Sequence, residues 1–474
     1  MMKVWEQYVP ELVIDLYELT MAESYLREGM SGEATFSVFI RGYPAERAYF
    51  VSAGLEHLLE ILPDFRFSSE SLRYIKSLGK FSSGFVDYLR DFRFSGCIRA
   101  IPEGRIFFSQ EPVIEVTAPI VEAQIVETLV LNVIHLETML ASKAARMMQA
   151  AGGRGVIDFG MRRTHGIDAS VKAARTSYLT GSLGTSNLLA GKIYGIPVFG
   201  TMAHSYVTSF QREIDAFCAF ARAFPDNSVF LIDTYDTLAG ARKAAEVAEL
   251  ISGEGKKLLG VRLDSGDLLE LSRQVRLILD ESGFPDVKIM VSGNLDEYKV
   301  EALVNAGAPI DVFAVGTRLG VSADAPYLDI AYKLVEYERR PVLKLSSGKK
   351  TLIGKKQVYR RYDPEGKMDH DRICLLDSAD SDGEPLLDLV MKDGIAIRAT
   401  ESLASIRARF REEWEKLPLK YRAIQPKGYY PVQVSEVLRR LDARTAEEKR
   451  VEEVESFIRP AVCRESDGLV VVKE

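Results

Sequence analysis

The sequence VIDFGMRRTHGIDASVKAARTSYLTGSLGTSNLLAGKIYGIPVFGTMAHS, residues 156–205, determines the fold that we expect. A short apolar run at its start ends in a polar cluster that begins at Asp158. A second apolar run, Ile196–Phe199, ends in a polar cluster that reaches His204. A helical segment and a loop rich in Ser, Gly and Asn lie between the two runs. Two strands joined by a helix, each with polar residues at its end, are typical of a parallel sheet whose chemistry lies at the strand ends.

Apolar runs of strand length recur along the chain and alternate with helical segments. The predicted strands are Val156–Ile157, Ile196–Phe199, Val229–Ile232, Leu258–Leu263, Lys288–Val291 and Asp311–Val315. The helices predicted between them include Thr237–Ile251, Leu268–Leu279 and Glu297–Ala306. This many successive βα units favours an α/β fold with an irregular, TIM-like barrel. An open doubly wound sheet is the second choice, because no GxGxxG motif follows the first strand.

The chain, at 474 residues, is long enough for two or three domains. The expected division is an N-terminal α+β domain over 1–140, the catalytic barrel over 141–345, and a third region over 346–474. A helical region, Glu122–Gln149, should lead into the barrel and end at Gly152. The third region should contain a basic loop, a hairpin around Asp393-Gly394 returning toward the N-terminal domain, and a mainly helical C-terminal extension, including Val432–Ile458.

The composition is that of a soluble globular protein, with 47% hydrophobic and 27% charged residues. A net charge of -7 argues against a general nucleic-acid binder. No apolar run approaches the roughly 18 residues of a membrane span, and the N-terminus has no signal core. The 4 cysteines are far apart and form no CxxC pair, so neither disulfides nor a zinc site is expected, and a cytoplasmic location fits best.

Two glycine-containing pairs, Gly293-Asn294 and Gly316-Thr317, follow consecutive predicted strands. Glycine lets the backbone N–H groups approach an oxyanion, so both pairs suit phosphate, although each is also explained as a tight turn. Arg262 adds a guanidinium that suits phosphate. Asp264 could bind ribose hydroxyls or Mg²⁺, or could simply cap the following helix.

Arg162 and Arg163 follow an aromatic residue, Phe159. A planar cation beside a ring suits an aromatic carboxylate ligand, and a structural salt bridge is the alternative. His204, in a loop of small residues, could act as a base or nucleophile at neutral pH, or could be a buried packing residue.

Nine motifs, in this order and spacing, together resemble those of the nicotinate phosphoribosyltransferase family. They are DLYELTMA (15–22), LASKAAR (140–146), DFGMRR (158–163), TSNLLAG (185–191), GTMAHS (200–205), VRLDSGDL (261–268), VSGNL (291–295), FAVGTRLG (313–320) and GKKTLIGKKQVYR (348–360). The resemblance covers nearly the whole chain. It implies transfer of phosphoribose from phosphoribosyl pyrophosphate to nicotinate, coupled to ATP hydrolysis through transient phosphorylation of His204, with Mg²⁺ on the leaving pyrophosphate. It also implies an irregular barrel and a homodimer whose sites lie between subunits.

The resemblance also assigns roles to individual residues. Tyr17 would come from the neighbouring subunit and stack on the pyridine ring opposite Phe159. Arg162 and Ser186 would lie near the nicotinate carboxylate. The residues that would hold the 5′-phosphate are Arg262, Gly293, Asn294, Gly316 and Thr317, with Asp264 near the ribose.

Three alternatives remain open at this point. A nicotinamide phosphoribosyltransferase should place an acidic group near the ring amide, whereas Ser186-Asn187 offers none. A quinolinate phosphoribosyltransferase needs no ATP, which would leave His204 unexplained. A non-catalytic barrel that binds phosphorylated metabolites would also give no reason for a histidine beside the phosphate turns.

Overall fold

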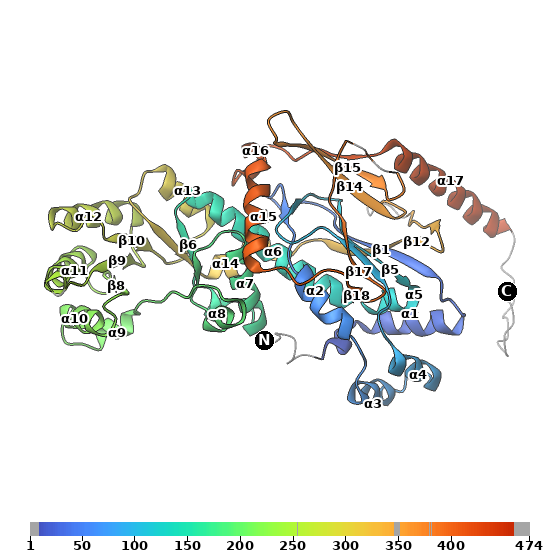
Figure 1. The fold of residues 1–474 in the computed structure, drawn as a ribbon, viewed down its shortest axis with the longest axis horizontal. Coiled ribbons are helices and arrows are strands. Elements are labelled where there is room, and N and C mark those ends of the chain that lie inside the picture. The colour runs from blue at the N-terminus through green and yellow to red at the C-terminus, as the bar shows by residue number, and fades with distance from the viewer. Residues whose placement is uncertain (1–8, 254, 346–350, 379, 381, 459–474) are drawn as a thin grey trace.

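The computed structural model describes residues 9–253, 255–345, 351–378, 380 and 382–458. The molecule is elongated, with a parallel α/β unit at one end and a large antiparallel sheet at the other (Figure 1). Helix α15 (Leu403–Lys416) stands between them. In the part of the chain that is described, no helix is long and apolar enough to cross a membrane. Residues 348–350 of the basic motif lie outside the described residues.

Six parallel strands form the sheet of the α/β unit, in the order β7-β6-β11-β10-β9-β8. The strands are β6 (Gly155–Asp158), β7 (Gly184–Thr185), β8 (Ser228–Leu231), β9 (Leu258–Leu263), β10 (Lys288–Val291) and β11 (Val312–Val315). The sheet curls, but within the described residues its edge strands β7 and β8 do not pair, so it forms a half-barrel. The prediction of an irregular, TIM-like α/β fold is confirmed.

Helices connect these strands and cover the half-barrel. They are α7 (Ile167–Leu179), α8 (Leu188–Tyr194), α9 (His204–Thr208), α10 (Glu213–Ala223), α11 (Thr237–Ser252), α12 (Leu268–Glu281), α13 (Glu297–Asn305) and α14 (Thr317–Gly320). Apolar residues of β6, β8 to β11 and α9 to α14 form a shared core with the end of α6, whereas α7 and α8 form a small cluster of their own. The alternation of strands and helices therefore follows the sequence pattern closely.

The predicted strand at Ile196–Phe199 is wrong. Only Val198 makes a β-bridge, to Thr185 of β7. Pro197 has no N–H to donate, so this segment cannot continue a regular ladder. Gly184 permits the close approach, because a Cβ there would lie 2.1 Å from the Pro197 carbonyl oxygen.

A long helix, α6 (Glu127–Ala151), leads from the antiparallel sheet into the half-barrel. The predicted helical region Glu122–Gln149 is divided at Val126, and the shorter helix before it is α5 (Ile120–Ile125). Gly152 ends α6 with a φ of 58°, as predicted. This left-handed conformation is one that glycine adopts at little cost.

The antiparallel sheet combines strands from distant parts of the chain, in the order β13-β12-β1-β5-β3-β17-β18. Their bounds are β1 (Glu33–Ile40), β3 (Cys97–Ala100), β5 (Pro112–Pro119), β12 (Ile330–Tyr337), β13 (Arg340–Pro341), β17 (Asp388–Lys392) and β18 (Ile395–Ala396). Although β12 falls within the range 141–345, it pairs with β1 along its whole length. The hairpin β17–β18 turns at Asp393-Gly394, and β17 pairs with β3.

Smaller elements complete the molecule. On the N-terminal side these are α1 (Leu16–Arg27), α2 (Leu55–Ile61), α3 (Ser69–Ser77), α4 (Ser83–Asp91) and the pair β2 (Phe50–Val51) and β4 (Ile106–Phe107). The C-terminal region contains α16 (Leu419–Arg422), α17 (Glu436–Ile458) and a sheet of β14 (Lys356–Tyr362), β15 (Met368–Leu375), β16 (Glu384–Pro385) and β19 (Val432–Val434). This third sheet was not predicted, and β19 replaces the start of the helix expected from Val432.

Helix α1 carries a buried carboxyl group, Glu18, whose side chain accepts hydrogen bonds from the backbone and side chain of Thr128. Burial raises the pKa of Glu18 to about 8. Between the unfolded value near 4.5 and this pKa, the folded state holds a proton that the unfolded state has lost. Stability should therefore fall as pH rises through this window, by up to about 1.4 kcal/mol per pH unit.

We expect Glu18→Gln to remove this contribution, so that the variant gains stability relative to the unmodified protein as pH rises from 5 to 8. Thermal denaturation at several pH values measures the difference. The matched control is Glu28→Gln, which removes an exposed carboxylate at the end of the same helix. A constant difference between the Glu18 variant and the unmodified protein at all pH values would contradict the prediction.

Candidate active site

The carboxyl ends of the parallel strands hold most of the predicted site residues. Those at or just after a strand end are Phe159 and Arg162 (β6), Ser186 (β7), Arg262 and Asp264 (β9), Gly293 and Asn294 (β10), and Gly316 and Thr317 (β11). Because parallel strands end at one edge of their sheet, these residues share one end of the half-barrel. His204 joins them as the first residue of α9.

His204 contacts two different strand ends. Its Nδ1 lies 3.1 Å from Thr234 Oγ1. Its Nε2 lies 4.0 Å from Asp233 Oδ1 and 4.0 Å from Asp264 Oδ2. The side chain is 43% exposed, so it is not a buried packing residue. The imidazole is therefore oriented by the protein and remains accessible to a ligand.

Asp233, which follows β8, organises the turn after β9. Its Oδ2 accepts hydrogen bonds from Asp264 N at 2.9 Å and Ser265 Oγ at 2.6 Å. Its Oδ1 is buried, has no hydrogen-bond partner among the described residues, and lies nearest to His204. Asp233 directly follows the predicted strand Val229–Ile232, but no role was predicted for it. Its position at the end of the strand next to β9, which ends beside Asp264, could have indicated a role in the site.

Asp264 is not the cap of the following helix. The cap of α12 is Asp267, which accepts hydrogen bonds from Leu269 N and Glu270 N at 3.1 and 3.2 Å. The Asp264 carboxylate instead accepts a hydrogen bond from Ser292 Oγ and is 38% exposed beside His204. The alternative that Asp264 caps the helix is therefore wrong, and its carboxylate is accessible to a ligand.

Arg262 provides a cation at the same edge. Burial lowers its pKa, while the charges of Asp264 and Asp233 oppose this effect and Arg162 adds to it. Arg162 is thus close enough for the two guanidinium groups to influence each other. Arg262 Nη2 donates to the Met202 carbonyl at 2.8 Å, but its buried Nε has no partner within the described residues. A guanidinium group with an unpartnered N–H at this edge suits an anionic ligand.

The two glycine pairs form turns that pack tightly on neighbouring strand ends. Gly293 and Asn294 have φ values of 91° and 48°, both in the left-handed region. A Cβ on Gly293 would lie 2.0 Å from the Asp264 carbonyl oxygen, and one on Gly316 would lie 3.0 Å from that of Phe159. The lack of a side chain at each glycine permits this close packing, and glycine turns of this kind can present backbone N–H groups to a phosphate.

Asp158, at the end of β6 directly before Phe159, is a buried carboxylate that contacts the segment holding Ser186. Its oxygens accept hydrogen bonds from Gly160 N at 2.8 Å and Thr185 Oγ1 at 2.7 Å, and Ser186 N donates to its carbonyl at 2.8 Å. Burial raises the pKa of the Asp158 carboxyl group, while the hydrogen bonds from the Thr185 side chain and the Gly160 backbone oppose this shift. Arg162 is exposed and forms no ion pair with a described carboxylate, so the salt-bridge alternative has no support in this chain.

Tyr17 is not brought to this site within one chain. It lies on α1, which packs against α5 beside the antiparallel sheet, at the far end of the molecule from β8–β10 (Figure 1). Its side chain is near Glu127 and 46% of the residue is exposed. An interaction between Tyr17 and a ligand at Phe159 therefore requires a second subunit.

The described residues contain no group of three or more His, Cys, Asp and Glu side chains that could hold a metal by themselves. The carboxylates of Asp233 and Asp264 nevertheless face one space beside His204, and one oxygen of Asp233 is unpartnered among the described residues. Mg²⁺ commonly uses one or two carboxylates together with substrate phosphates and water. These residues fit that mode of binding.

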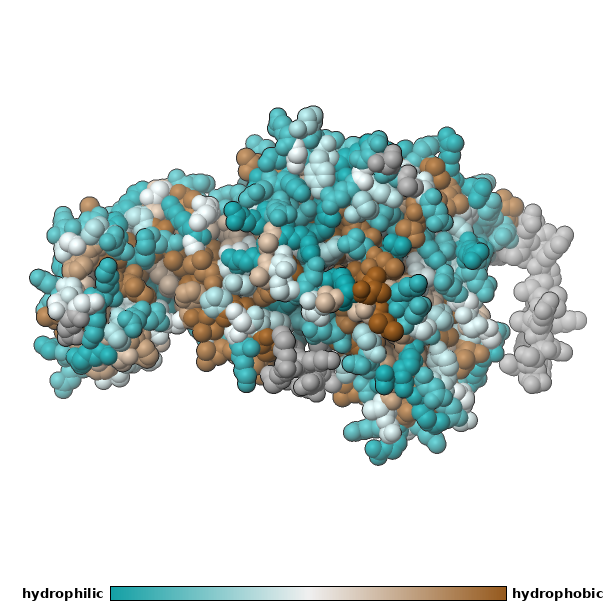
Figure 2. Space-filling view, in the orientation of Figure 1, coloured by the Kyte–Doolittle hydropathy of each residue, from teal (hydrophilic) through white to brown (hydrophobic). Residues whose placement is uncertain are grey.

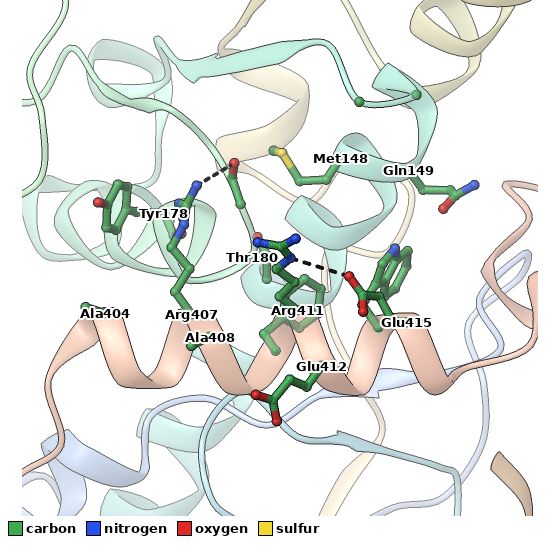
Figure 3. A pocket seen from close by; sticks show the side chains of 15 residues that line it. Met148, Gln149, Tyr178, Thr180, Ala404, Arg407, Ala408, Arg411, Glu412 and Glu415 are labelled. Atoms are coloured by element: carbon green, nitrogen blue, oxygen red, sulfur yellow. Dashed lines mark hydrogen bonds and ion pairs between the residues drawn. The ribbon is translucent and has the colours of Figure 1, made fainter. Parts of the chain in front are cut away.

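A separate cavity of about 920 Å³ lies at the opposite end of the half-barrel. It is lined by the ends of α6 and α7, which lead into the amino ends of β6 and β7, and by α15. Figure 3 shows Arg407 of α15 reaching across it toward the end of α7. Arg407 donates to the carbonyls of Ser182 and Gly181 at 2.7 and 3.0 Å. This cavity contains none of the predicted site residues, and the guanidinium group of Arg407 is already hydrogen-bonded to the segment that follows α7.

Family models match three successive parts of the chain. They describe the nicotinate phosphoribosyltransferase N-terminal domain (12–135), the nicotinate phosphoribosyltransferase family (155–365) and the C-terminal domain (377–442). A nicotinate phosphoribosyltransferase of Mycobacterium tuberculosis is 48% identical over 436 residues, covering 91% of this chain and 92% of that protein. One from Bacillus subtilis is 36% identical, covering 94% and 96%.

Among solved structures, human nicotinic acid phosphoribosyltransferase superposes with a TM-score of 0.82 at 27% identity, covering 91% of this chain and 100% of that one. The fold is that of an α/β half-barrel enzyme with polar residues at the carboxyl ends of its parallel strands. Within that class, the chain belongs to the nicotinate phosphoribosyltransferase family.

Proposed function

We propose that this chain is an ATP-coupled nicotinate phosphoribosyltransferase of NAD biosynthesis that acts in the cytoplasm. It converts nicotinate, phosphoribosyl pyrophosphate, ATP and water to nicotinate mononucleotide, pyrophosphate, ADP and phosphate. The observation that carries the proposal is the position of an accessible His204 between Asp233 and Asp264, at the edge that also holds two glycine turns. Relatives of the same length carry this name.

The donor occupies the side of the site formed by β9, β10 and β11. Backbone N–H groups of the turns at Gly293-Asn294 and Gly316-Thr317 bind its 5′-phosphate, and the charge of Arg262 attracts it. The accessible carboxylate of Asp264 accepts hydrogen bonds from the ribose hydroxyls. Tight packing of Gly293 against Asp264 couples the phosphate position to the ribose position.

The acceptor occupies the side formed by β6 and β7. Phe159 stacks on the pyridine ring, and Arg162 and Ser186 bind the carboxylate. Asp158 is 1% exposed and both of its oxygens are already hydrogen-bonded, so it cannot accept from a ring amide. A site with a free guanidinium and no free acid near the ring favours nicotinate over nicotinamide.

Transfer forms a bond between the pyridine nitrogen and the anomeric ribose carbon as the bond from that carbon to pyrophosphate breaks. Positive charge develops on the ribose, and the protein stabilises it by placing the Asp264 carboxylate nearby. Mg²⁺, held by pyrophosphate oxygens and by Asp233 or Asp264, would neutralise the leaving group. Arg162 keeps the acceptor in line with the donor.

His204 supplies the coupling to ATP. Thr234 fixes the ring through Nδ1, which leaves Nε2 as the nitrogen that faces the donor. Nε2 attacks the γ-phosphorus of ATP, the bond to ADP breaks, and a phosphohistidine remains. Its negative charge draws cations to the site and tightens binding of the donor, and water later releases phosphate. The balance is one ATP hydrolysed for each nucleotide formed.

The active unit is a homodimer in which Tyr17 of one subunit reaches the pyridine ring held by the other. Exposed apolar residues along the open edge of the half-barrel support this arrangement: Leu183, Leu188, Val198 and Phe199. Figure 2 shows brown surface over the region of α7 and α8. An exposed apolar surface at the edge of a sheet is a usual place for a second subunit.

Product formation from nicotinate, nicotinamide and quinolinate, each with and without ATP, tests the proposal. We expect nicotinate alone to react rapidly, with ATP stimulating the rate. A preference for nicotinamide would indicate a nicotinamide phosphoribosyltransferase instead. An ATP-independent reaction with quinolinate would indicate a quinolinate phosphoribosyltransferase. No transfer to any of the three would leave only a binding function.

Replacing Arg162 by alanine should raise the KM for nicotinate about 10- to 100-fold, because a charge-assisted hydrogen bond contributes about 1.5–3 kcal/mol. The KM for phosphoribosyl pyrophosphate should change much less. Steady-state kinetics with each substrate varied in turn measure both constants. Arg73→Ala, which removes an exposed arginine from α3, serves as the control. Equal increases in the two KM values would argue against a contact with the carboxylate.

A further inference from the structure

A buried cluster of charged side chains joins α6 to the segments that follow both glycine turns. We call it the α6 charge cluster, and its members are Arg47, Lys143, Arg146, Glu297 and Asp324. Each side chain is at most 5% exposed. Lys143 and Arg146 belong to the LASKAAR motif, residues 140–146, to which the site described above gives no role.

Each acidic member of the cluster follows one of the turns. Glu297 is the first residue of α13, directly after the turn at Gly293-Asn294 and its cap. Asp324 follows α14, which begins at Thr317. The two turns thus lead, within a few residues, into two buried carboxylates.

Two cations on one face of α6 hold both carboxylates. Lys143 Nζ forms an ion pair with Glu297 and lies 2.9 Å from Asp324 Oδ1. Arg146 Nε lies 3.1 Å from Glu297 Oε1 and 3.5 Å from Asp324 Oδ2. Because α6 is a single long helix, these contacts fix the distance between the starts of the two segments.

The backbone between α14 and Asp324 is also held in an uncommon conformation. Ser322 is buried with a φ of 46°, a left-handed conformation that a serine keeps only when its surroundings enforce it. Arg47 Nη2 donates to Ser322 Oγ at 2.7 Å and to Asp324 Oδ1 at 3.0 Å. Ser322 Oγ in turn donates to the Ala325 carbonyl at 2.7 Å. The segment after the second turn is therefore set by the same cluster.

On the basis of the function proposed above, we propose that Lys143 and Arg146 are positioning residues for the 5′-phosphate of the donor. They touch no substrate. They act through Glu297 and Asp324, which set the separation of the two glycine turns that bind the phosphate from either side. Oxyanion binding by backbone N–H groups depends on that separation, since a displacement of 1 Å can cost about 100-fold in rate.

The test compares Lys143→Met and Lys143→Arg with the unmodified enzyme. Methionine keeps the volume and loses the charge, whereas arginine keeps the charge. We expect Lys143→Met to raise the KM for phosphoribosyl pyrophosphate about 10- to 100-fold and to change the KM for nicotinate by less than about twofold. Lys143→Arg should recover most of the loss. If Lys143→Met does not fold, Glu297→Gln, which keeps the shape of the side chain, should show the same selective effect.

A matched control separates positioning from stability. Asp371→Asn removes a charge from a fully buried ion pair with Arg360, in the sheet of β14 and β15 remote from the half-barrel. It should lower the melting temperature without altering the KM for the donor. An equal rise in the KM for phosphoribosyl pyrophosphate in Asp371→Asn would overturn the proposal. So would an equal rise of the KM for the donor and the KM for nicotinate in Lys143→Met. Either result would leave the cluster with a purely structural role.

Binding of ribose 5-phosphate, measured by calorimetry, separates this proposal from the proposed function. If the unmodified protein transfers phosphoribose to none of the pyridines, the function fails. In that case, weaker binding of ribose 5-phosphate by Lys143→Met would still support a role of Lys143 in positioning the phosphate turns. Equal binding by both proteins, or none by either, would overturn it.

Discussion

Replacement of His204 by alanine is expected to abolish the stimulation of transfer by ATP while leaving a slow, ATP-independent formation of nicotinate mononucleotide. This change leaves in place the turns and arginines that are proposed to bind the substrates, so transfer itself should continue. Without the imidazole, no phosphohistidine forms, and ATP can no longer strengthen donor binding. The rates measured with and without ATP should therefore become equal.

Three measurements check this expectation. Initial rates at fixed substrate concentrations measure the stimulation of transfer by ATP. The rate of ATP hydrolysis without nicotinate measures turnover of the phosphohistidine. Labelled ATP measures the amount of phosphate bound to the protein. His165→Ala, which removes an exposed histidine near the arginines, should leave all three unchanged. Stimulation by ATP that persists in His204→Ala would place the phosphorylated group elsewhere.

The second large effect is expected for Gly293→Ala. The φ of 91° at Gly293 is unfavourable for alanine, and the added Cβ would lie 2.0 Å from the Asp264 carbonyl oxygen. The phosphate turn or the Asp264 segment must then move. Asp264 lies beside His204 and is proposed to bind the ribose, so either movement should disturb binding of the donor. We expect kcat/KM for phosphoribosyl pyrophosphate to fall by at least about 100-fold, together with a lower melting temperature.

Gly84→Ala provides the comparison for this variant. Gly84 lies in α4, its added Cβ meets nothing within 4 Å, and its φ is not in the left-handed region. That change should leave kinetics intact, because alanine suits a helix better than glycine does. A Gly293→Ala enzyme with nearly normal kcat/KM would mean that the turn lies away from the donor.

The repeating strands and helices of the half-barrel could be predicted because the hydrophobic periodicity of each element is visible in its own residues. The sheet order could not, since it depends on pairing between distant segments such as β1 and β12. The segment Ile196–Phe199 has the composition of a strand, and only its proline and its place at the sheet edge prevent regular pairing. The proline is visible in the local pattern, whereas the place of this segment at the sheet edge is a tertiary constraint that the local pattern does not indicate.

The candidate site shows the same division. Residues at strand ends were predicted together because parallel strands bring them together. The contacts of His204 with Asp233 and Thr234 join separate βα units, and no spacing in the sequence indicates them. The links from α6 to Glu297 and Asp324 were likewise hidden, because charged residues within a helix usually indicate an exposed face.

The pairing of β12 with β1 has a consequence for the growing chain on the ribosome. The strands β1, β3 and β5 are synthesised early, but one edge of β1 gains its partner only when Ile330–Tyr337 emerges. The half-barrel is made from consecutive residues and can assemble during this interval. Until then, one edge of β1 in the nascent amino-terminal sheet has no partner, although most of its residues are buried in the finished fold. Chaperones or another nascent chain can bind to such an edge.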